Sequence, residues 1–220
     1  MIYLCTIVLI VVTNTLLSVS GECAGVLDLV FVVDSSALIK ETDPYGWIKL
    51  KWFIIDITRE FTISQMDVRV GLTTFSDYAS ERPNSPGDST SDVEFFYLNT
   101  YNDSSSLENA IHRLHYFGSS TNMGDGVRVA YHTLLKQSNG DRPDVQNIVI
   151  VISGGAPSVP ILPTETDALK MKAFVVVISV SSSVNRVHLG QIASRLDYVL
   201  DIREYTEIDE ILKIIINAVC

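Results

Sequence analysis

The sequence is poor in the features that nucleic-acid-binding and membrane-surface proteins use. Its 220 residues contain 16 Lys and Arg against 26 Asp and Glu, which gives a formal net charge of −10. A chain of this charge repels a phosphate backbone, which argues against nucleic acid as a partner. No Lys/Arg-rich run and no basic amphipathic helix occurs, so a basic patch for a membrane surface is not expected either.

The chain also lacks the short motifs of common hydrolases and nucleotide-binding enzymes. It has no Gly-x-Ser-x-Gly elbow and no Gly-x4-Gly-Lys-Ser/Thr phosphate loop. Ser153-Gly154-Gly155 is glycine-rich, but its spacing fits a tight turn better than a phosphate cradle. His112 and His115 have no accompanying acidic motif, so we interpret them as surface histidines. We therefore expect a protein that is not an enzyme, with a secreted hydrolase as the poorer alternative.

Long hydrophobic runs are missing after the first residues of the chain. Residues 1–20 carry no charge and contain the apolar run Ile7–Val12, followed by small residues at the positions that signal peptidase reads. We expect a signal peptide over 1–20, cleaved before Gly21, and therefore a secreted protein. An uncleaved anchor is the alternative, although Thr13–Thr15 interrupts a run already short for a membrane span. The later apolar runs are strand-sized, so no membrane insertion is expected.

Cysteine is scarce, with three in the whole sequence. Cys5 would leave with the signal peptide, and Cys23 and Cys220 would remain near the two ends of one domain over residues 21–220. Domain termini often lie close together, and thiols oxidise outside the cell, so we expect a Cys23–Cys220 disulfide. Free or intermolecular thiols are the alternative.

The hydrophobic pattern alternates between strands and helices. Apolar runs typical of buried strands occur at Leu29–Val33, Asn147–Ile152 and Ala173–Val180, and further strands are expected at Val68–Phe75, Val93–Leu98 and Tyr198–Ile202. Helices are expected at Tyr45–Phe61, Ser105–Leu114, after Gly124 through Leu134, and at Leu189–Leu196 and Ile208–Val219. This order predicts an α/β fold, a doubly wound and mostly parallel sheet with helices on both faces and one antiparallel edge strand.

Two local motifs lie around the start of the second expected helix. Asn102-Asp103-Ser104 is an N-glycosylation sequon in an expected loop, where a usable acceptor should lie. Ser105 and Glu108 have the spacing of a capping box, which predicts that the helix begins at Ser105.

Polar turns follow or precede several of the expected elements. They are Asp34-Ser35-Ser36, Gly118–Gly124 and Ser153-Gly154-Gly155. In open α/β sheets, ligands bind beyond the carboxyl ends of the strands, and carboxylate and hydroxyl oxygens suit a hard cation. Capping of the following helix explains Asp34 and its serines about equally well.

Taken in order, these phrases resemble the von Willebrand factor type A domain, as found in matrilins, several collagens and integrin I domains. The matching phrases are Leu27–Ser36, Val70–Ser76, Gly118–Gly124, Ile148–Gly155 and Leu189–Ser194. The resemblance covers essentially Cys23 to Cys220, including the terminal cysteine pair usual in extracellular members. It implies the doubly wound, Rossmann-like fold of that family and a role in adhesion.

The resemblance also implies where a divalent cation would bind. In the family, an Asp-x-Ser-x-Ser turn, a loop Thr and an Asp hold the ion, and an acidic residue of the partner completes its coordination. Asp34, Ser36 and Thr121 match three of these positions, whereas Leu38 and Gly154 stand where the family has a hydroxyl and a carboxylate. We therefore expect a degenerate site that binds Mg²⁺, Mn²⁺ or Ca²⁺ weakly or not at all.

By the same resemblance, we expect a secreted extracellular-matrix module that binds another extracellular protein, such as collagen. The binding loops would be Asp34–Ile39, Gly118–Gly124 and Ser153–Ser158. The expected contact residues in them are Ser35, Leu38, Ser120, Asn122, Gly154 and Ser158. The alternative is a structural matrix component that self-associates without a dedicated ligand site.

Overall fold

The computed structural model describes residues 25–41, 43–77, 94–158, 160–180, 186–202 and 208–219. The expected signal peptide and both cysteines of the expected disulfide, Cys23 and Cys220, lie outside the described residues and stay predictions. In the part of the chain that is described, no helix is long and apolar enough to cross a membrane.

A six-stranded sheet with the order β3-β2-β1-β4-β5-β6 forms the centre of the molecule. The strands are β1 (Leu27–Asp34), β2 (Val68–Phe75), β3 (Phe95–Phe96), β4 (Asn147–Ser153), β5 (Phe174–Ser179) and β6 (Val199–Asp201). All neighbouring strands are parallel except β3, which pairs antiparallel with β2 at one edge. The predicted fold class is therefore confirmed.

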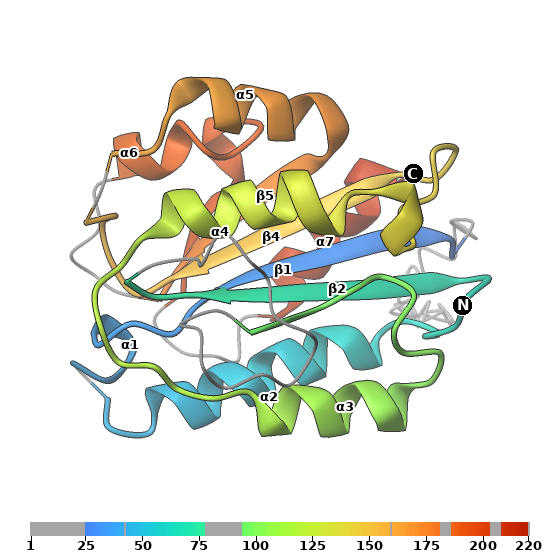
Figure 1. Ribbon diagram of the computed structural model, residues 1–220, viewed down its shortest axis with the longest axis horizontal. Coiled ribbons are helices and arrows are strands. Elements are labelled where there is room, and N and C mark those ends of the chain that lie inside the picture. The colour runs from blue at the N-terminus through green and yellow to red at the C-terminus, as the bar shows by residue number, and fades with distance from the viewer. Residues whose placement is uncertain are drawn as a thin grey trace, which may run out of the picture.

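Helices cover both faces of this sheet (Figure 1). They are α1 (Leu38–Glu41), α2 (Gly46–Arg59), α3 (Ser104–Arg113), α4 (Met123–Val129), α5 (Pro163–Lys172), α6 (Arg186–Gly190) and α7 (Ile208–Val219). The chain continues from α4 into a π-helical turn, η1 (Ala130–Leu134), and short 3₁₀ turns occur at η2 (Gln137–Asn139) and η3 (Leu196–Tyr198). Helices α2, α3 and α7 pack in one apolar cluster, and α4, α5 and α6 pack in the other.

Strand β1 shows why the central strands are apolar throughout. Leu29, Phe31 and Val33 pack against the layer of α2, α3 and α7, and Val30 and Val32 pack against the layer of α4 to α6. All five side chains are fully buried, because successive residues of a strand point to opposite faces and both faces are covered. The sheet is thus a rigid support for the loops at its two ends.

The structure corrects several local predictions. Helix α3 begins after Asp103, whose carboxylate accepts a hydrogen bond from the Ser106 amide at 2.8 Å, so the predicted Ser105–Glu108 capping box is wrong. Glu108 instead pairs with Arg59 of α2. Helix α5 was not predicted, because it buries little more than Thr166 and Leu169 and so has almost no apolar periodicity.

Candidate functional site

Three loops meet at the carboxyl end of the sheet, and we call them the carboxyl-edge loops. They are residues 34–39 after β1, residues 118–124 before α4 and residues 153–158 after β4. The Ala37 amide donates to the Ser119 carbonyl at 2.9 Å. The amide and hydroxyl of Ser158 both donate to the Thr121 carbonyl at 2.7 Å. These contacts join segments far apart in the sequence into one surface.

Asp34 ends β1 beneath this surface and is fully buried. Its Oδ1 accepts a hydrogen bond from the Ser36 amide at 2.8 Å. Its Oδ2 accepts from the Gly154 amide at 2.9 Å and from the Ser153 hydroxyl at 3.3 Å. Burial raises the pKa of Asp34, and these hydrogen bonds oppose that rise because they stabilise the charged form. Asp34 thereby ties the loop after β1 to the loop after β4.

The other two candidate ligands, Ser36 and Thr121, lie in contact with each other. The Thr121 hydroxyl donates to the Ser36 hydroxyl oxygen at 2.8 Å, and both residues are buried. Since the Ser36 amide also donates to Asp34, all three residues named from the sequence belong to one hydrogen-bonded group. The sequence prediction named Ser153 only as part of a turn, and nothing in the pattern indicated that its hydroxyl reaches Asp34.

Leu38 and Ile39 occupy the space beside the two glycines that follow β4. A Cβ atom added to Gly155 would come within 2.3 Å of Leu38 Cδ1, and one added to Gly154 within 2.9 Å of Ile39 Cδ1. The Gly154 position would also bring its Cβ within 3.1 Å of the Ile39 amide nitrogen. A side chain at position 154, such as the carboxylate that the family has there, therefore has no free space in this packing.

The residues present form a weaker cation site than the family's full ligand set. Mg²⁺ takes six oxygen ligands in a near-octahedral arrangement, of which waters supply several and one or two carboxylates usually come from the protein. The group offers one carboxylate, Asp34, and two hydroxyls, Ser36 and Thr121, which are already hydrogen-bonded. No cluster of three or more His, Cys, Asp or Glu suited to a metal occurs among the described residues. In the structure, hydrogen bonds link the members of this group.

The expected contact residues divide into exposed and buried sets. Ser120 and Ser158 are exposed, and Leu38 is half-buried, so these three reach the surface. The buried residues Ser35, Asn122 and Gly154 shape the loops instead. Asn122, for example, caps α4 by accepting a hydrogen bond from the Asp125 amide at 3.4 Å.

The surface also includes residues that were not among the expected contact residues, although two of them lie within the predicted loops. Ala37 and Ala156 are exposed at the tips of two of the carboxyl-edge loops. Asp77, which follows β2, accepts a hydrogen bond from the Ser120 hydroxyl. In the sequence, only the position of Asp77 directly after a strand pointed to a role in the site, because its partner Ser120 lies on another loop.

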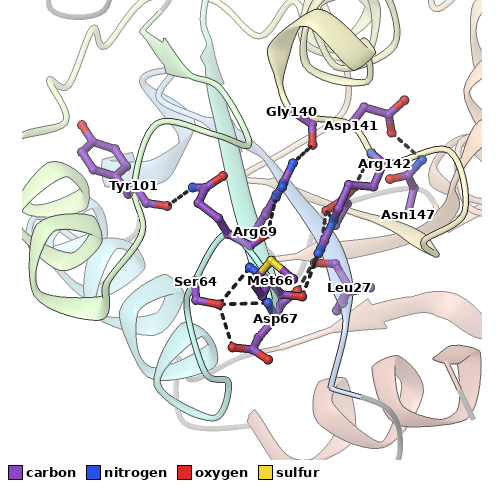
Figure 2. Close-up of polar contacts among 12 residues, drawn as sticks. Leu27, Ser64, Met66, Asp67, Arg69, Tyr101, Gly140, Asp141, Arg142 and Asn147 are labelled. Atoms are coloured by element: carbon purple, nitrogen blue, oxygen red, sulfur yellow. Dashed lines mark hydrogen bonds and ion pairs between the residues drawn. The ribbon is translucent and has the colours of Figure 1, made fainter.

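A different kind of polar group lies at the amino end of the sheet (Figure 2). Here Asp28, fully buried near the start of β1, is paired with Arg142. The Arg142 amide donates to Asp28 Oδ2 at 2.7 Å and its Nε donates to Asp28 Oδ1 at 2.9 Å. The same guanidinium donates to the carbonyls of Leu27, Met66 and Asp67. Burial raises the pKa of Asp28, although Arg142 opposes the rise.

Comparison with known proteins agrees with this architecture. The sequence profile of the von Willebrand factor type A domain matches residues 28–214. Mouse matrilin-2 is 24% identical over 197 residues, which cover 88% of this chain and 19% of matrilin-2. Mouse matrilin-3 is 30% identical over 145 residues, which cover 62% of this chain and 27% of that protein. The chain thus spans roughly a fifth to a quarter of the length of these relatives.

Solved structures share the fold. Proximal thread matrix protein 1 of the mussel byssus superimposes with a TM-score of 0.75 at 22% identity, covering 90% of this chain and 49% of that one. A further structure of the mussel protein has the same TM-score, identity and coverage. It is described with zinc in its metal-ion-dependent adhesion site (MIDAS) motif.

Proposed function

This chain belongs to the von Willebrand factor type A domain family, and from that premise we propose that it is a secreted adhesion module that binds an extracellular matrix protein. Relatives named as matrilins and as a collagen chain support an extracellular setting. Collagen is the first candidate partner. The binding surface is the set of carboxyl-edge loops, and no chemical reaction is assigned to it.

The observation that carries this proposal is the joining of three loops into one surface at the end of the sheet. Ala37, Ser120, Ala156 and Ser158 present small, exposed side chains there, above a buried layer of hydrogen bonds. A preorganised surface loses little conformational entropy when a partner binds, which favours recognition.

We further propose that this adhesion needs no cation. Asp34 is held by amide and hydroxyl donors, and Leu38 and Ile39 fill the space beside Gly154 and Gly155. The hydrogen bonds satisfy the carboxylate that a cation would otherwise neutralise. The mussel protein, which shares the fold, differs from this proposal because its structure is described with zinc in the corresponding motif.

Calorimetric titration of Mg²⁺ and Mn²⁺ into the purified, oxidised protein tests cation independence. We expect no binding heat in the native protein and none in Asp34→Ala. Saturable heat in the native protein that disappears in Asp34→Ala would contradict the proposal and would restore a cation-bridged partner.

Binding to immobilised collagen in the presence of a chelator tests the adhesion itself. We expect saturable binding that Ser120→Arg and Ser158→Arg weaken at least tenfold, because a long charged side chain obstructs the surface at the carboxyl-edge loops. Ser138→Arg, at an exposed position in η2 on the connection that leads to the start of β4, is the matched control and should bind normally. Equal binding by all variants would remove these loops as the binding surface.

Self-association is the second candidate function. Tyr45, Ile48 and Trp52, which are 66%, 51% and 44% exposed, form an apolar stripe along the start and outer face of α2. Apolar stripes of this kind often mark contacts between proteins. Concentration-dependent association in sedimentation, without added ligand and reduced by Trp52→Glu, would favour this function over collagen binding.

A further inference from the structure

We propose that Asn102 carries an N-linked glycan. The sequon Asn102-Asp103-Ser104 runs from the connection after β3 into the first residue of α3, Ser104, and all three residues are exposed. The inference requires that the chain enters the secretory pathway, but it does not depend on the partner or on the cation independence proposed above. It adds a modification site to a part of the molecule that the adhesion surface does not use.

The neighbours of Asn102 hold the sequon in an outward position. On one side, the Tyr101 ring packs edge-on against Phe96 with centroids 5.0 Å apart, and the Tyr101 carbonyl accepts from Gln65 Nε2 at 3.2 Å. On the other side, Asp103 has an extended backbone and caps α3 through the Ser106 amide. The chain is therefore anchored on both sides of Asn102, while Asn102 itself stays exposed.

The groups that the modification needs are unencumbered. Within the described residues, no hydrogen bond engages the side-chain amide of Asn102 or the hydroxyl of Ser104. The neighbouring cap is made by Asp103 and Ser106, so neither Asn102 nor Ser104 is needed for the helix start. Modification at Asn102 thus removes no contact that stabilises the fold.

The chemistry is a glycosyl transfer from a polyprenyl-diphosphate-linked oligosaccharide. Asn102 Nδ2 forms a bond to C1 of the first sugar, and the bond between C1 and the diphosphate oxygen breaks. Nδ2 loses one proton, and the polyprenyl diphosphate leaves with the electron pair of the broken bond. The product has a neutral, bulky and well-solvated group at the surface.

The proposed glycan lies at the amino end of the sheet. The Tyr101 carbonyl accepts from Gln65, in the turn that precedes β2, and Arg142 donates to the Met66 and Asp67 carbonyls of the same turn (Figure 2). The carboxyl-edge loops lie at the other end of the parallel strands. A glycan at Asn102 therefore covers the amino edge and leaves the proposed adhesion surface open.

The test is secretion of the full chain from cultured animal cells, followed by mass spectrometry before and after peptide N-glycosidase treatment. Ser104→Ala and Asn102→Gln destroy the sequon, whereas Ser104→Thr preserves it and is the matched control. We expect the native chain and Ser104→Thr to lose the mass of a glycan on treatment, with conversion of residue 102 to Asp. The Ser104→Ala and Asn102→Gln chains should be secreted without that mass.

Two results overturn the inference. One is a secreted native chain whose mass the enzyme does not change. The other is a native chain that stays in the cytosol, because it would then never meet the oligosaccharide donor. Collagen binding measured on the Ser104→Ala protein separates this inference from the adhesion proposal, since that binding should equal the binding of the native chain.

Discussion

Strand β1 carries a fully buried aspartate near each end, and the two carboxylates are held in opposite ways. Near its start, Asp28 is paired with the guanidinium of Arg142. At its end, Asp34 is held by the amides of Ser36 and Gly154 and the hydroxyl of Ser153, and none of its hydrogen-bond partners among the described residues is a cationic side chain. Burial raises the pKa of both, so each costs free energy to keep ionised.

The difference shows what each end of the sheet is built to do. Arg142 binds Asp28 and the carbonyls of three residues, so one side chain joins the starts of β1 and β2 to the loop before β4. That arrangement is structural. Asp34 instead positions loops that reach the surface, and neutral donors can hold a carboxylate without filling the surface with a long side chain.

The largest effect is expected from Arg142→Met, which removes the charge partner of Asp28. A buried carboxylate left without its partner costs about 3–5 kcal/mol of unfolding free energy. Urea unfolding measures the loss, and Arg128→Met, which breaks the half-exposed pair with Asp125, should cost at most about 1 kcal/mol. The double variant Asp28→Asn with Arg142→Met should lose less than Arg142→Met alone. An equal or greater loss of unfolding free energy in the double variant would show that the unpaired Asp28 carboxylate does not cause the loss in Arg142→Met.

Asp34→Ala should have the next largest effect. It leaves the amides of Ser36 and Gly154 buried without their acceptor, and each such group costs about 1–3 kcal/mol. The two amides sum to about 2–6 kcal/mol, and we expect a loss in the lower half of that range in urea unfolding, because the substitution also removes the cost of burying the Asp34 carboxylate. Asp144→Ala, at an exposed position, is the control and should change stability little. A loss no larger than that of the control would mean that Asp34 does not hold the loops together.

The titration of Asp34 should change the unfolding free energy with pH, by less than the Asp34→Ala substitution does and with a defined sign. Because the pKa of Asp34 is raised in the folded protein, the folded state binds a proton more readily than the unfolded state. The contribution of Asp34 to stability is therefore present at low pH and is lost as pH rises above the ordinary aspartate pKa of 3.8. Asp34→Asn cannot titrate, so its stability relative to the native protein should improve as pH rises. Parallel unfolding curves of both proteins at all pH values would contradict this.

Gly155→Ala should have the smallest effect. The new Cβ lies 2.3 Å from Leu38 Cδ1, the flexible end of a half-buried side chain, so Leu38 must move. We expect a loss of about 1 kcal/mol, the low end for an overpacked site. In a Leu38→Ala background the same substitution should be neutral when measured by thermal unfolding. If Gly155→Ala cost the same stability in the Leu38→Ala background, the contact with Leu38 would not be the cause of the loss.

Much of the fold followed from local pattern. The limits of β2 and α7 agree with the predicted ranges, because β2 is apolar or β-branched at most of its positions and α7 has a long amphipathic repeat. Weakly patterned elements were missed or misplaced. Helix α5 buries too few apolar side chains to be recognised, and the start of α3 was assigned to Ser105 because two residues with capping potential lie close together.

By itself, the sequence determined the alternating α/β order, the family resemblance, and the lack of a second carboxylate and a third hydroxyl at Gly154 and Leu38. These follow from residue types at fixed positions along the chain. Only the tertiary structure decided that Ser153 and Gly154 hold Asp34, that Leu38 and Ile39 fill the space beside the glycines, and that Arg142 reaches Asp28. Each of these contacts joins residues brought together by strand order, which depends on how both faces of the sheet are buried, and local sequence does not encode that.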